Sequence, residues 1–506
     1  MTSVQHVSPK EQSDLTLEEA TKKYWISLSK NKSEMVVSCG GVADLKALFQ
    51  LVINTIMADR ATRKLTLRYC RDLDATAILL NEILPSCLSL ESLVLDGVNL
   101  SRACLVPIKD RIERKQLREL AIFRHWIDCD LGMLLAEALN TEGGLQVLQL
   151  EMAHIGDVVA ESLLENGIYL RELNLSNNNL SPSISGAVLH LLQTGRLESL
   201  RLAYNSLLGG QEGGSETVAA AVAASTTLRV LDLRGVKQTA FLPIFDAVGN
   251  SPSMEDLLLS GSGIDDKDIP SLCKAIRASK QLKRLDLSRN NIRTKGYMQL
   301  VSTLSHNSTL EYLDIHGNDI YLAGGSSLER LLENNTGLQE LVLTTPRSPK
   351  SGVVILEASE CEAAFRALKV NKTLRVLHMN KALIGAKGVH LLSEVLRVNP
   401  TLAELHMEDV QYPNWTGVVE ALKDNSSLEK FAVRNMDDEQ KKVVDCYTRL
   451  HRLGSKLVKE NCVNLGVIPH ALTNKQCDLD LTYFLLRGIP SLLQNRESAV
   501  PPSDID

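Results

Sequence analysis

Two histidines and two glutamates late in the repetitive part of the chain have side chains that could do chemistry. His378 and His406 stand at equivalent places in successive repeats, and Glu404 and Glu408 flank His406. Imidazole and carboxylate groups ligate metals and transfer protons when they converge on one point. The elements that carry these residues therefore decide between a reactive site and a plain polar surface.

Two aspartates and a third histidine form a similar set earlier in the chain. Asp286 and Asp314 occupy the same place in two consecutive repeats, and His316 follows Asp314 by two residues. If each repeat contributes one strand to a sheet, equivalent residues in adjacent strands lie about 4.8 Å apart. We expect Asp286 beside Asp314, with His316 near Asp314.

The elements that position these residues follow from one repeated phrase, in which apolar residues occupy positions 1, 4 and 6. It is clearest at Leu282, Leu310 and Leu338. The first and last phrases begin 366 residues apart and thirteen steps separate them, so the mean period is about 28. The fourteen phrases begin at Thr62, Leu90, Leu117, Leu145, Leu170, Leu197, Leu228, Met254, Leu282, Leu310, Leu338, Leu374, Leu402 and Leu428.

Each phrase predicts a short strand, and each following segment predicts a helix. Segments such as Thr294 to Ser305 and Gly385 to Leu396 show the apolar period of 3.6 residues that is typical of a helix. A single repeat of this kind cannot bury its apolar face alone, whereas stacked repeats bury one another. The sequence therefore predicts an α/β repeat solenoid.

The period and the full helix in each repeat resemble the ribonuclease-inhibitor-like class of leucine-rich repeats, over about residues 34–435. That class includes the repeats of NOD-like receptors and of Ran GTPase-activating proteins. The resemblance implies a right-handed horseshoe with a parallel sheet on its concave face and helices on its convex face. Position 9 is usually Asn or Cys in this class, and here it is Asn178, Asn205, Asn290, Asn318 or Cys70 in five repeats. We interpret these asparagines as structural, because the turn needs their hydrogen bonds.

We expect three regions. Residues 1–33 form a polar arm with a capping helix at about Leu15 to Leu28, residues 34–435 form the solenoid of 14–15 repeats, and residues 436–506 form a helical cap and a disordered tail. The cap is required because the last repeat would otherwise leave an apolar face open. The basic, proline-containing segment at 344–360 is an ordinary solvated excursion, a binding loop, or a phosphorylation site at Ser348.

Positions 3, 5 and 7 of each phrase lie between the buried leucines, so they face the concave side. An open sheet does not converge its side chains and does not exclude water, which disfavours metal binding and catalysis. We therefore predict no catalytic, cofactor or metal site, and a surface that binds a protein. Its acidic residues favour a basic partner surface. The predicted contact residues are Arg201, Asp232, Asp256, Arg284, Asp286, Tyr312, Asp314, His316, His378, Glu404, His406 and Glu408.

The bulk composition agrees with an interaction protein of the cytoplasm, with the nucleus as an alternative. A net charge of -6 on 506 residues implies no general attraction to nucleic acid or anionic lipid. The first thirty residues lack a signal-peptide pattern, and no apolar run is long enough to cross a membrane. Ten scattered cysteines without a Cys-x-x-Cys pair favour a reducing compartment. The oligomeric state is not predicted.

The resemblance leaves several functions open. The first is a non-catalytic interaction scaffold. The second is a small-GTPase activator of the Ran type, but the tail from Asn495 to Asp506 lacks the acidic tract of that family. The third is a NOD-like sensor paralogue without a nucleotide-binding domain. Ribonuclease inhibition is disfavoured, because those inhibitors are richer in cysteine and acidic residues.

Overall fold

The structure, a computed structural model, divides into two compact units. It describes residues 16–459, apart from 23–25, 30–32, 43, 60, 208–212, 237–240, 321–326, 344–356, 411–413 and 435. Unit 1 comprises Met1–Gly263 and Ala278–Leu282, and unit 2 comprises Ile264–Arg277 and Lys283–Asp506. Ser348, the helix expected at 478–493 and the disordered tail lie outside the described residues.

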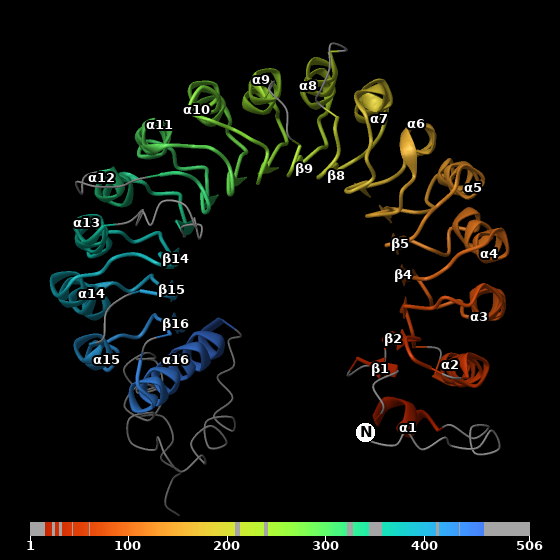
Figure 1. The fold of residues 1–506 in the computed structure, drawn as a ribbon, viewed down its shortest axis with the longest axis horizontal. Helices are drawn as coiled ribbons and strands as arrows, with labels where there is room; N and C mark the ends of the chain where they lie inside the picture. Colours follow the sequence, from red (N-terminus) through yellow and green to blue (C-terminus); the bar gives the residue numbers. More distant parts are fainter. Residues whose placement is uncertain are drawn as a thin grey trace, which may run out of the picture. The chain divides into compact units, whose positions relative to one another are not determined.

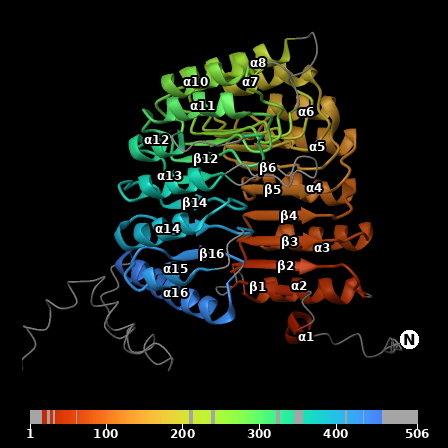
Figure 2. The same ribbon diagram turned by 60° about the vertical axis from the view of Figure 1, so that its left-hand side comes forward.

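Unit 1 alternates strands and helices. Strand β1 is antiparallel to β2, and β2 to β10 pair in parallel with their neighbours in chain order. Figure 2 shows β2 to β5 lying side by side. The strands are β1 (Ile26–Leu28), β2 (Glu34–Ser38), β3 (Lys64–Arg68), β4 (Ser92–Asp96), β5 (Glu119–Phe123), β6 (Val147–Gln149), β7 (Glu172–Asn174), β8 (Ser199–Arg201), β9 (Val230–Asp232) and β10 (Asp256–Leu258). The helices are α1 (Leu17–Lys22), α2 (Leu45–Asp59), α3 (Leu73–Ser86), α4 (Arg102–Glu113), α5 (Cys129–Leu139), α6 (Gly156–Asn166), η1 (Pro182–Ile184), α7 (Ser185–Thr194), α8 (Gly214–Ala224) and α9 (Leu242–Asn250).

Unit 2 repeats the same arrangement. Strands β11 to β16 pair in parallel in chain order, and in both units the helices lie on one side of the strands (Figure 1). The strands are β11 (Arg284–Asp286), β12 (Tyr312–Asp314), β13 (Glu340–Val342), β14 (Val376–His378), β15 (Glu404–His406) and β16 (Lys430–Ala432). The helices are α10 (Ile269–Ala278), α11 (Thr294–Leu304), α12 (Ser327–Asn334), α13 (Ala358–Leu368), α14 (Ala386–Val398), α15 (Thr416–Ala421) and α16 (Asp438–Lys459).

The apolar positions of the phrase form the core, which confirms the predicted α/β repeat solenoid. In the β12 repeat, Leu310, Leu313 and Ile315 are all buried. In the strand register Leu313 stands beside Leu341, and Leu377 stands beside Leu405. Full burial of one such side chain contributes about 2 kcal/mol, so the same three positions stabilise every repeat.

The position-9 asparagines satisfy backbone groups at the turn after each strand, as predicted. Asn178 Nδ2 donates to the carbonyls of Leu150 and Leu175, at 2.6 and 2.9 Å. Its Oδ1 accepts from the backbone of Ala153 at 2.9 Å. Each asparagine therefore joins its own turn to the turn of the preceding repeat.

A second polar ladder, which the sequence analysis did not predict, lies at the turn before each strand from β9 to β16. Asn399 Nδ2 donates to the carbonyls of Leu368 and Asn371, and its Oδ1 accepts from the backbone of Thr401 and Leu402. The signal was present in the sequence, because a polar residue stands three places before the first position of eight successive phrases. These residues are Ser225, Ser251, Ser279, Asn307, Asn335, Asn371, Asn399 and Asn425.

The beginning of the chain differs from the expected helix over 15–28. Helix α1 ends at Lys22, and residues 26–28 instead form β1, antiparallel to β2. Ile26 pairs with Val37 and is buried, so the first edge of the sheet receives a strand in place of a longer helix. Ile26, which was expected on the apolar face of a helix, is therefore part of the sheet.

Helix α16 packs against the last strand and helix of unit 2. It contacts β16 and α15, and His451 Nδ1 lies 2.6 Å from the carbonyl oxygen of Leu428. Arg452 Nη2 donates to the carbonyl of Glu429 at 3.0 Å. This helix therefore covers part of the final repeat, as expected of a cap.

Position 8 of the phrase adopts a left-handed backbone conformation in most described repeats. Glycine occupies it at four described turns (Gly97, Gly235, Gly261 and Gly317), and non-glycine residues occupy the other eight, among them Tyr69 and Tyr204 with φ of 57° and 55°. A non-glycine residue there costs about 1 kcal/mol. The ring of Tyr204 lies directly over Gly235 of the next repeat, where a Cβ atom would overlap it.

Replacing Gly235 with alanine should therefore destabilise the protein by about 2–3 kcal/mol, from backbone strain and overlap with Tyr204. Gly156→Ala is the control, because its φ is +65° and nothing lies within 4 Å of its added Cβ; it should cost only about 1 kcal/mol. Chemical denaturation measures both. If Tyr204→Ala fails to reduce the cost of Gly235→Ala, the steric explanation is wrong.

Replacing Asn399 with alanine should lower the unfolding free energy by about 2–4 kcal/mol, because buried backbone groups lose their partners. The matched control is Asn334→Ala, since Asn334 is exposed and its amide donates to the carbonyl of Arg330 within its own helix. The control should change stability by less than about 0.5 kcal/mol. Equal effects of the two changes would contradict the structural role of the second ladder.

Candidate functional site

The predicted contact residues of unit 2 lie on the strands that the repeat phrase produces, except His316 and Glu408, which each follow a strand by two residues. The register pairs Asp286 with Asp314 and His378 with His406, as predicted. Because side chains alternate along a strand, Leu285 and Leu313 point into the core while these residues point away from it. They belong to one polar surface formed by β11 to β16, which we call the strand face.

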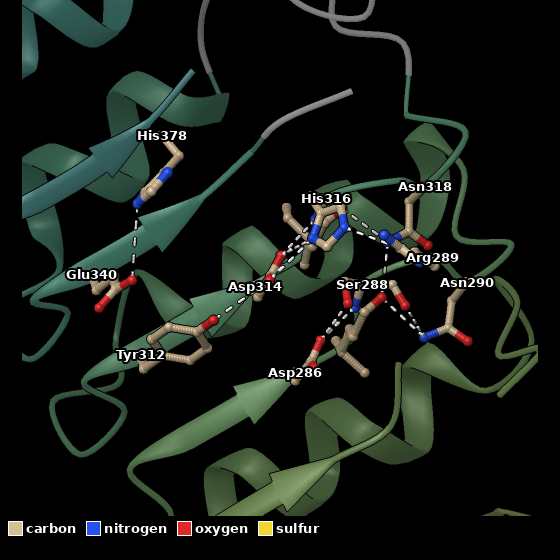
Figure 3. A network of polar contacts seen from close by, with 12 residues as sticks. Asp286, Ser288, Arg289, Asn290, Tyr312, Asp314, His316, Asn318, Glu340 and His378 are labelled. Carbon is tan, nitrogen blue, oxygen red and sulfur yellow. Dashed lines mark hydrogen bonds and ion pairs between the residues drawn. The ribbon is translucent and has the colours of Figure 1, made fainter. Parts of the chain in front are cut away.

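Asp314 is the centre of the strand face (Figure 3). Its Oδ1 accepts from the backbone of His316 at 2.8 Å and lies 2.9 Å from His316 Nδ1, and its Oδ2 accepts from the Tyr312 hydroxyl at 3.4 Å. Arg289 Nε donates to His316 Nε2 at 3.4 Å. Nε2 is then an acceptor, which leaves the Nδ1 proton to donate to Asp314.

Tyr312 and Asp286 are each fixed by a neighbour. The Arg284 guanidinium lies over the Tyr312 ring, 4.0 Å from its centroid. Burial raises the pKa of the Tyr312 hydroxyl, and the carboxylate of Asp314 adds to the effect. Asp286 Oδ1 accepts from the backbone and the hydroxyl of Ser288 at 2.9 and 2.6 Å. These contacts hold the side chains in defined orientations before any partner arrives.

His378 and His406 form a stacked pair farther along the strand face. Their ring centroids are 4.0 Å apart and their planes differ by 10°. His406 Nε2 lies 3.1 Å from Glu404 Oε2, and His378 Nε2 lies 4.0 Å from Glu340 Oε1. The pair thus sits between two carboxylates but shares no single ligand position with them.

The local electrostatics keep His378 neutral. Burial, together with the neighbouring His406, lowers the pKa of His378 to about 4, although Asp314 and Glu404 oppose this shift. Burial also raises the pKa of Glu340, with nearby carboxylates adding to the effect against Arg284.

Two of the predicted acidic contacts are neutralised by cations of the last repeat. Glu404 Oε2 lies 3.5 Å from Lys430 Nζ, and Glu408 Oε2 lies 2.8 Å from Arg434 Nη2. Burial opposes ionisation of Glu404, but the contacts with His406 and Lys430 leave its pKa below the usual value. The sequence reading missed Arg434, although its place at position 7 beside Glu408 was visible in the register.

Of the three predicted contact residues of unit 1, Asp232 is buried and already engaged. Arg201 on β8 pairs in register with Asp232 on β9. The carboxylate of Asp232 is buried and binds Arg234, with Arg234 Nε at 2.9 Å and Nη2 at 2.6 Å. Asp232 cannot reach a partner without losing these bonds. Asp256 lies on β10, where it pairs in register with Val230.

The chemistry open to the strand face is limited by the contacts that its side chains already make. Among the described residues no group of three or more His, Cys, Asp or Glu side chains is placed to hold a metal ion. The hydroxyl of Ser288 has one proton, and that proton is donated to Asp286. It is therefore not set up for activation by His316. In the part of the chain that the structure describes, no helix is long and apolar enough to cross a membrane.

Comparisons with known proteins identify the repeat in both units. A family model described as Leucine Rich Repeat matches residues 169–191, and a second Leucine Rich repeat model matches 278–301 and 306–328. Among solved structures, an internalin from Listeria monocytogenes is similar at 15% identity with a TM-score of 0.44, covering 78% of this chain and 95% of that chain. No curated protein matches the chain.

The His378 pair should make stability depend on pH. The pKa of His378 is lowered on folding, so the unfolded chain binds the proton more tightly, and stability falls as the pH drops from about 6.5 to about 4. His378→Gln should remove on the order of 1–2 kcal/mol of that loss. Denaturation at several pH values measures it.

The groups facing His378 are His406, Glu340, Asp314, Glu404 and Lys430. The control variant must therefore change a histidine that lies outside this set. His390→Gln on α14 is suitable, because that side chain is 72% exposed. Parallel stability–pH curves for wild type and His378→Gln would show that His378 does not cause the acid sensitivity.

Proposed function

Because this chain is a leucine-rich-repeat protein, we propose that it is a non-catalytic scaffold that binds a partner protein on its strand face. The single observation behind the proposal is the pre-oriented polar network around Asp314 in Figure 3. Strands fix the positions of these side chains more accurately than loops do. A surface of this kind binds with little loss of side-chain freedom.

The charge balance of the strand face supports a partner with a moderately basic surface. Glu340 has no neutralising cation as close as those of Glu404 and Glu408, whose partners are Lys430 and Arg434. A basic side chain of the partner can pair with Glu340, and it can compete for Glu404. Exposed charges of this kind select partners and raise association rates more than they add affinity.

The remaining finer assignments belong to the same proposal. The strand face is the concave side of a ribonuclease-inhibitor-like solenoid that spans 34–435, with residues 436–506 as its cap. Cytoplasm or nucleus is the proposed location. It is supported by eight described cysteines that are all free, six of them buried, which suits a reducing compartment.

A photo-crosslinking amino acid at position 312 should capture the partner in cells that express the chain, whereas the same group at Met298 should not. Met298 lies on α11 and is 45% exposed, so it is an accessible control on the helix side. Mass spectrometry identifies the captured protein. Crosslinks from position 298 alone would place the partner on the helices and refute the strand face.

Glu340→Gln together with Glu404→Gln should weaken binding of the captured partner about tenfold, because two charge pairs are lost. Glu333→Gln with Glu420→Gln is the matched control, since both side chains are exposed on helices α12 and α15. Titration calorimetry gives the affinities. If the partner is a small GTPase and its rate of GTP hydrolysis rises on binding, the chain is an activator and the scaffold proposal fails.

A further inference from the structure

Two buried cysteines of unit 1 lie at the turns that follow two neighbouring strands. Cys39 follows β2 directly, and Cys70 lies two residues after β3, which pairs with β2 in the sheet (Figure 2). Cys39 is 4% exposed and Cys70 is fully buried. Their side chains are joined by a hydrogen bond between the two thiol groups. We call these two residues the thiol pair.

The geometry of the repeat explains why the two thiols meet. A position-9 side chain reaches the turn of the preceding repeat, as Asn178 does when its Oδ1 accepts from the backbone of Ala153. Cys70 occupies position 9 of its phrase, and the preceding turn begins at Cys39. The backbone joins the same two segments, because Cys39 N donates to the carbonyl of Arg68 at 2.8 Å. Main-chain and side-chain contacts therefore hold the two sulfur atoms near each other.

The surroundings make Cys70 the more nucleophilic of the two. The hydrogen bond from Cys39 lowers the pKa of the Cys70 thiol to about 7, although burial opposes this shift. The same hydrogen bond, together with burial, raises the pKa of the Cys39 thiol. Cys70 Sγ also lies 3.0 Å from Thr76 Oγ1. Because the thiolate is the reactive form of cysteine, Cys70 is the sulfur that attacks first and Cys39 is the sulfur that resolves the product.

The turn beside the thiol pair is open to solvent. Gly40 and Gly41 follow Cys39 directly, and both are exposed. Gly41 has a φ of +78°, and nothing lies within 4 Å of the place where its Cβ would be. The repeats near the end of a solenoid also open more readily than central ones, because each repeat contacts only its neighbours. A small oxidant can therefore reach the pair through local movement of this turn.

We propose that the thiol pair is an oxidative modification site, at which a peroxide joins Cys39 and Cys70 in a disulfide between two successive repeats of unit 1. The Cys70 thiolate attacks one oxygen of hydrogen peroxide, the O–O bond breaks, and hydroxide leaves, so Cys70 becomes a sulfenic acid. Cys39 then attacks this sulfur, and the sulfenic hydroxyl leaves as water with the Cys39 proton. Two thiols and one peroxide thus give one disulfide and two waters, and the two sulfurs lose the two electrons that the peroxide gains.

This modification is compatible with a reducing compartment, where disulfides form transiently under oxidants and are reduced again. The bond encloses helix α2 and strand β3, which lie between the two cysteines in the chain. Closing that loop removes conformational freedom from the opened state of the segment. Opening of the segment should therefore become rarer. The site is distinct from the strand face and does not rest on the function proposed for it.

The first test is direct detection of the bond. The full chain is treated with hydrogen peroxide, its remaining thiols are blocked with N-ethylmaleimide, and it is digested with trypsin without reduction. Trypsin releases peptides 33–46 and 69–71, each of which contains one cysteine of the pair. Mass spectrometry should find these two peptides joined. Their absence under conditions that oxidise the exposed Cys129 would overturn the proposal.

The order of the two steps is tested with single variants and the sulfenic-acid reagent dimedone. Cys39→Ala should leave Cys70 as a sulfenic acid that dimedone labels, whereas Cys70→Ala should reduce labelling of Cys39 at least about tenfold, because its thiol is the poorer nucleophile. Serine replaces alanine in either variant if circular dichroism shows that the alanine variant is unfolded. Equal labelling of the two cysteines would contradict the assigned roles.

The matched control is Cys104→Ala, since Cys104 is also fully buried in unit 1 but its thiol lies beside the hydroxyl of Ser101. The control should not change the yield of the joined peptides. In the oxidised wild type, amide hydrogens of α2 should exchange about tenfold more slowly, and those of α14 in unit 2 should be unaffected. The proposal fails if Cys70 joins Cys104 instead, or if the urea-unfolded chain forms the same bond as quickly.

Discussion

The structure depends on hydrogen bonds to the backbone N–H and C=O groups of two turns in each repeat, one before the strand and one after it. A strand of three residues forms few ladder bonds, so most polar groups of each repeat lie in its turns, and buried groups without partners cost about 1–3 kcal/mol each. The side-chain amide of Asn178 donates to a backbone carbonyl in the turn after its strand, and that of Asn399 donates to one in the turn before its strand. Where no such residue occurs, Arg111 supplies donors to the carbonyls of Leu84, Cys87 and Leu90.

This constraint explains how much could be predicted. The leucine period determines which residues of neighbouring strands become neighbours, so the pairing of Asp286 with Asp314 followed from counting. The helix expected over 15–28 was wrong because Ile26 is needed at the sheet edge, and no local pattern encodes that need. The second ladder was encoded as a polar residue at a fixed offset, but only its hydrogen bonds reveal its purpose.

The sequence predicted which residues lie on the strand face, but it did not predict which of their charges are paired within the chain. Counting places Glu404 and Glu408 on the strand face, yet it does not show which cations reach them. Lys430 and Arg434 belong to the following repeat. The rotamers and burial of these long side chains determine which carboxylates they contact. Asp232 shows the same limit in unit 1, because Arg234 turns a predicted contact residue into a buried ion pair.

Two positions of the repeat constrain their side chains differently. On the strand face the side chains alternate with the core, so their directions come from the sheet itself and their chemistry can vary without strain. At position 8 the turn requires a left-handed backbone, which glycine adopts at four described turns and which non-glycine residues such as Arg124 and Lys381 adopt as well. A non-glycine residue there costs about 1 kcal/mol. Because this strain recurs in most described repeats, it follows from the geometry of the turn and marks no single surface.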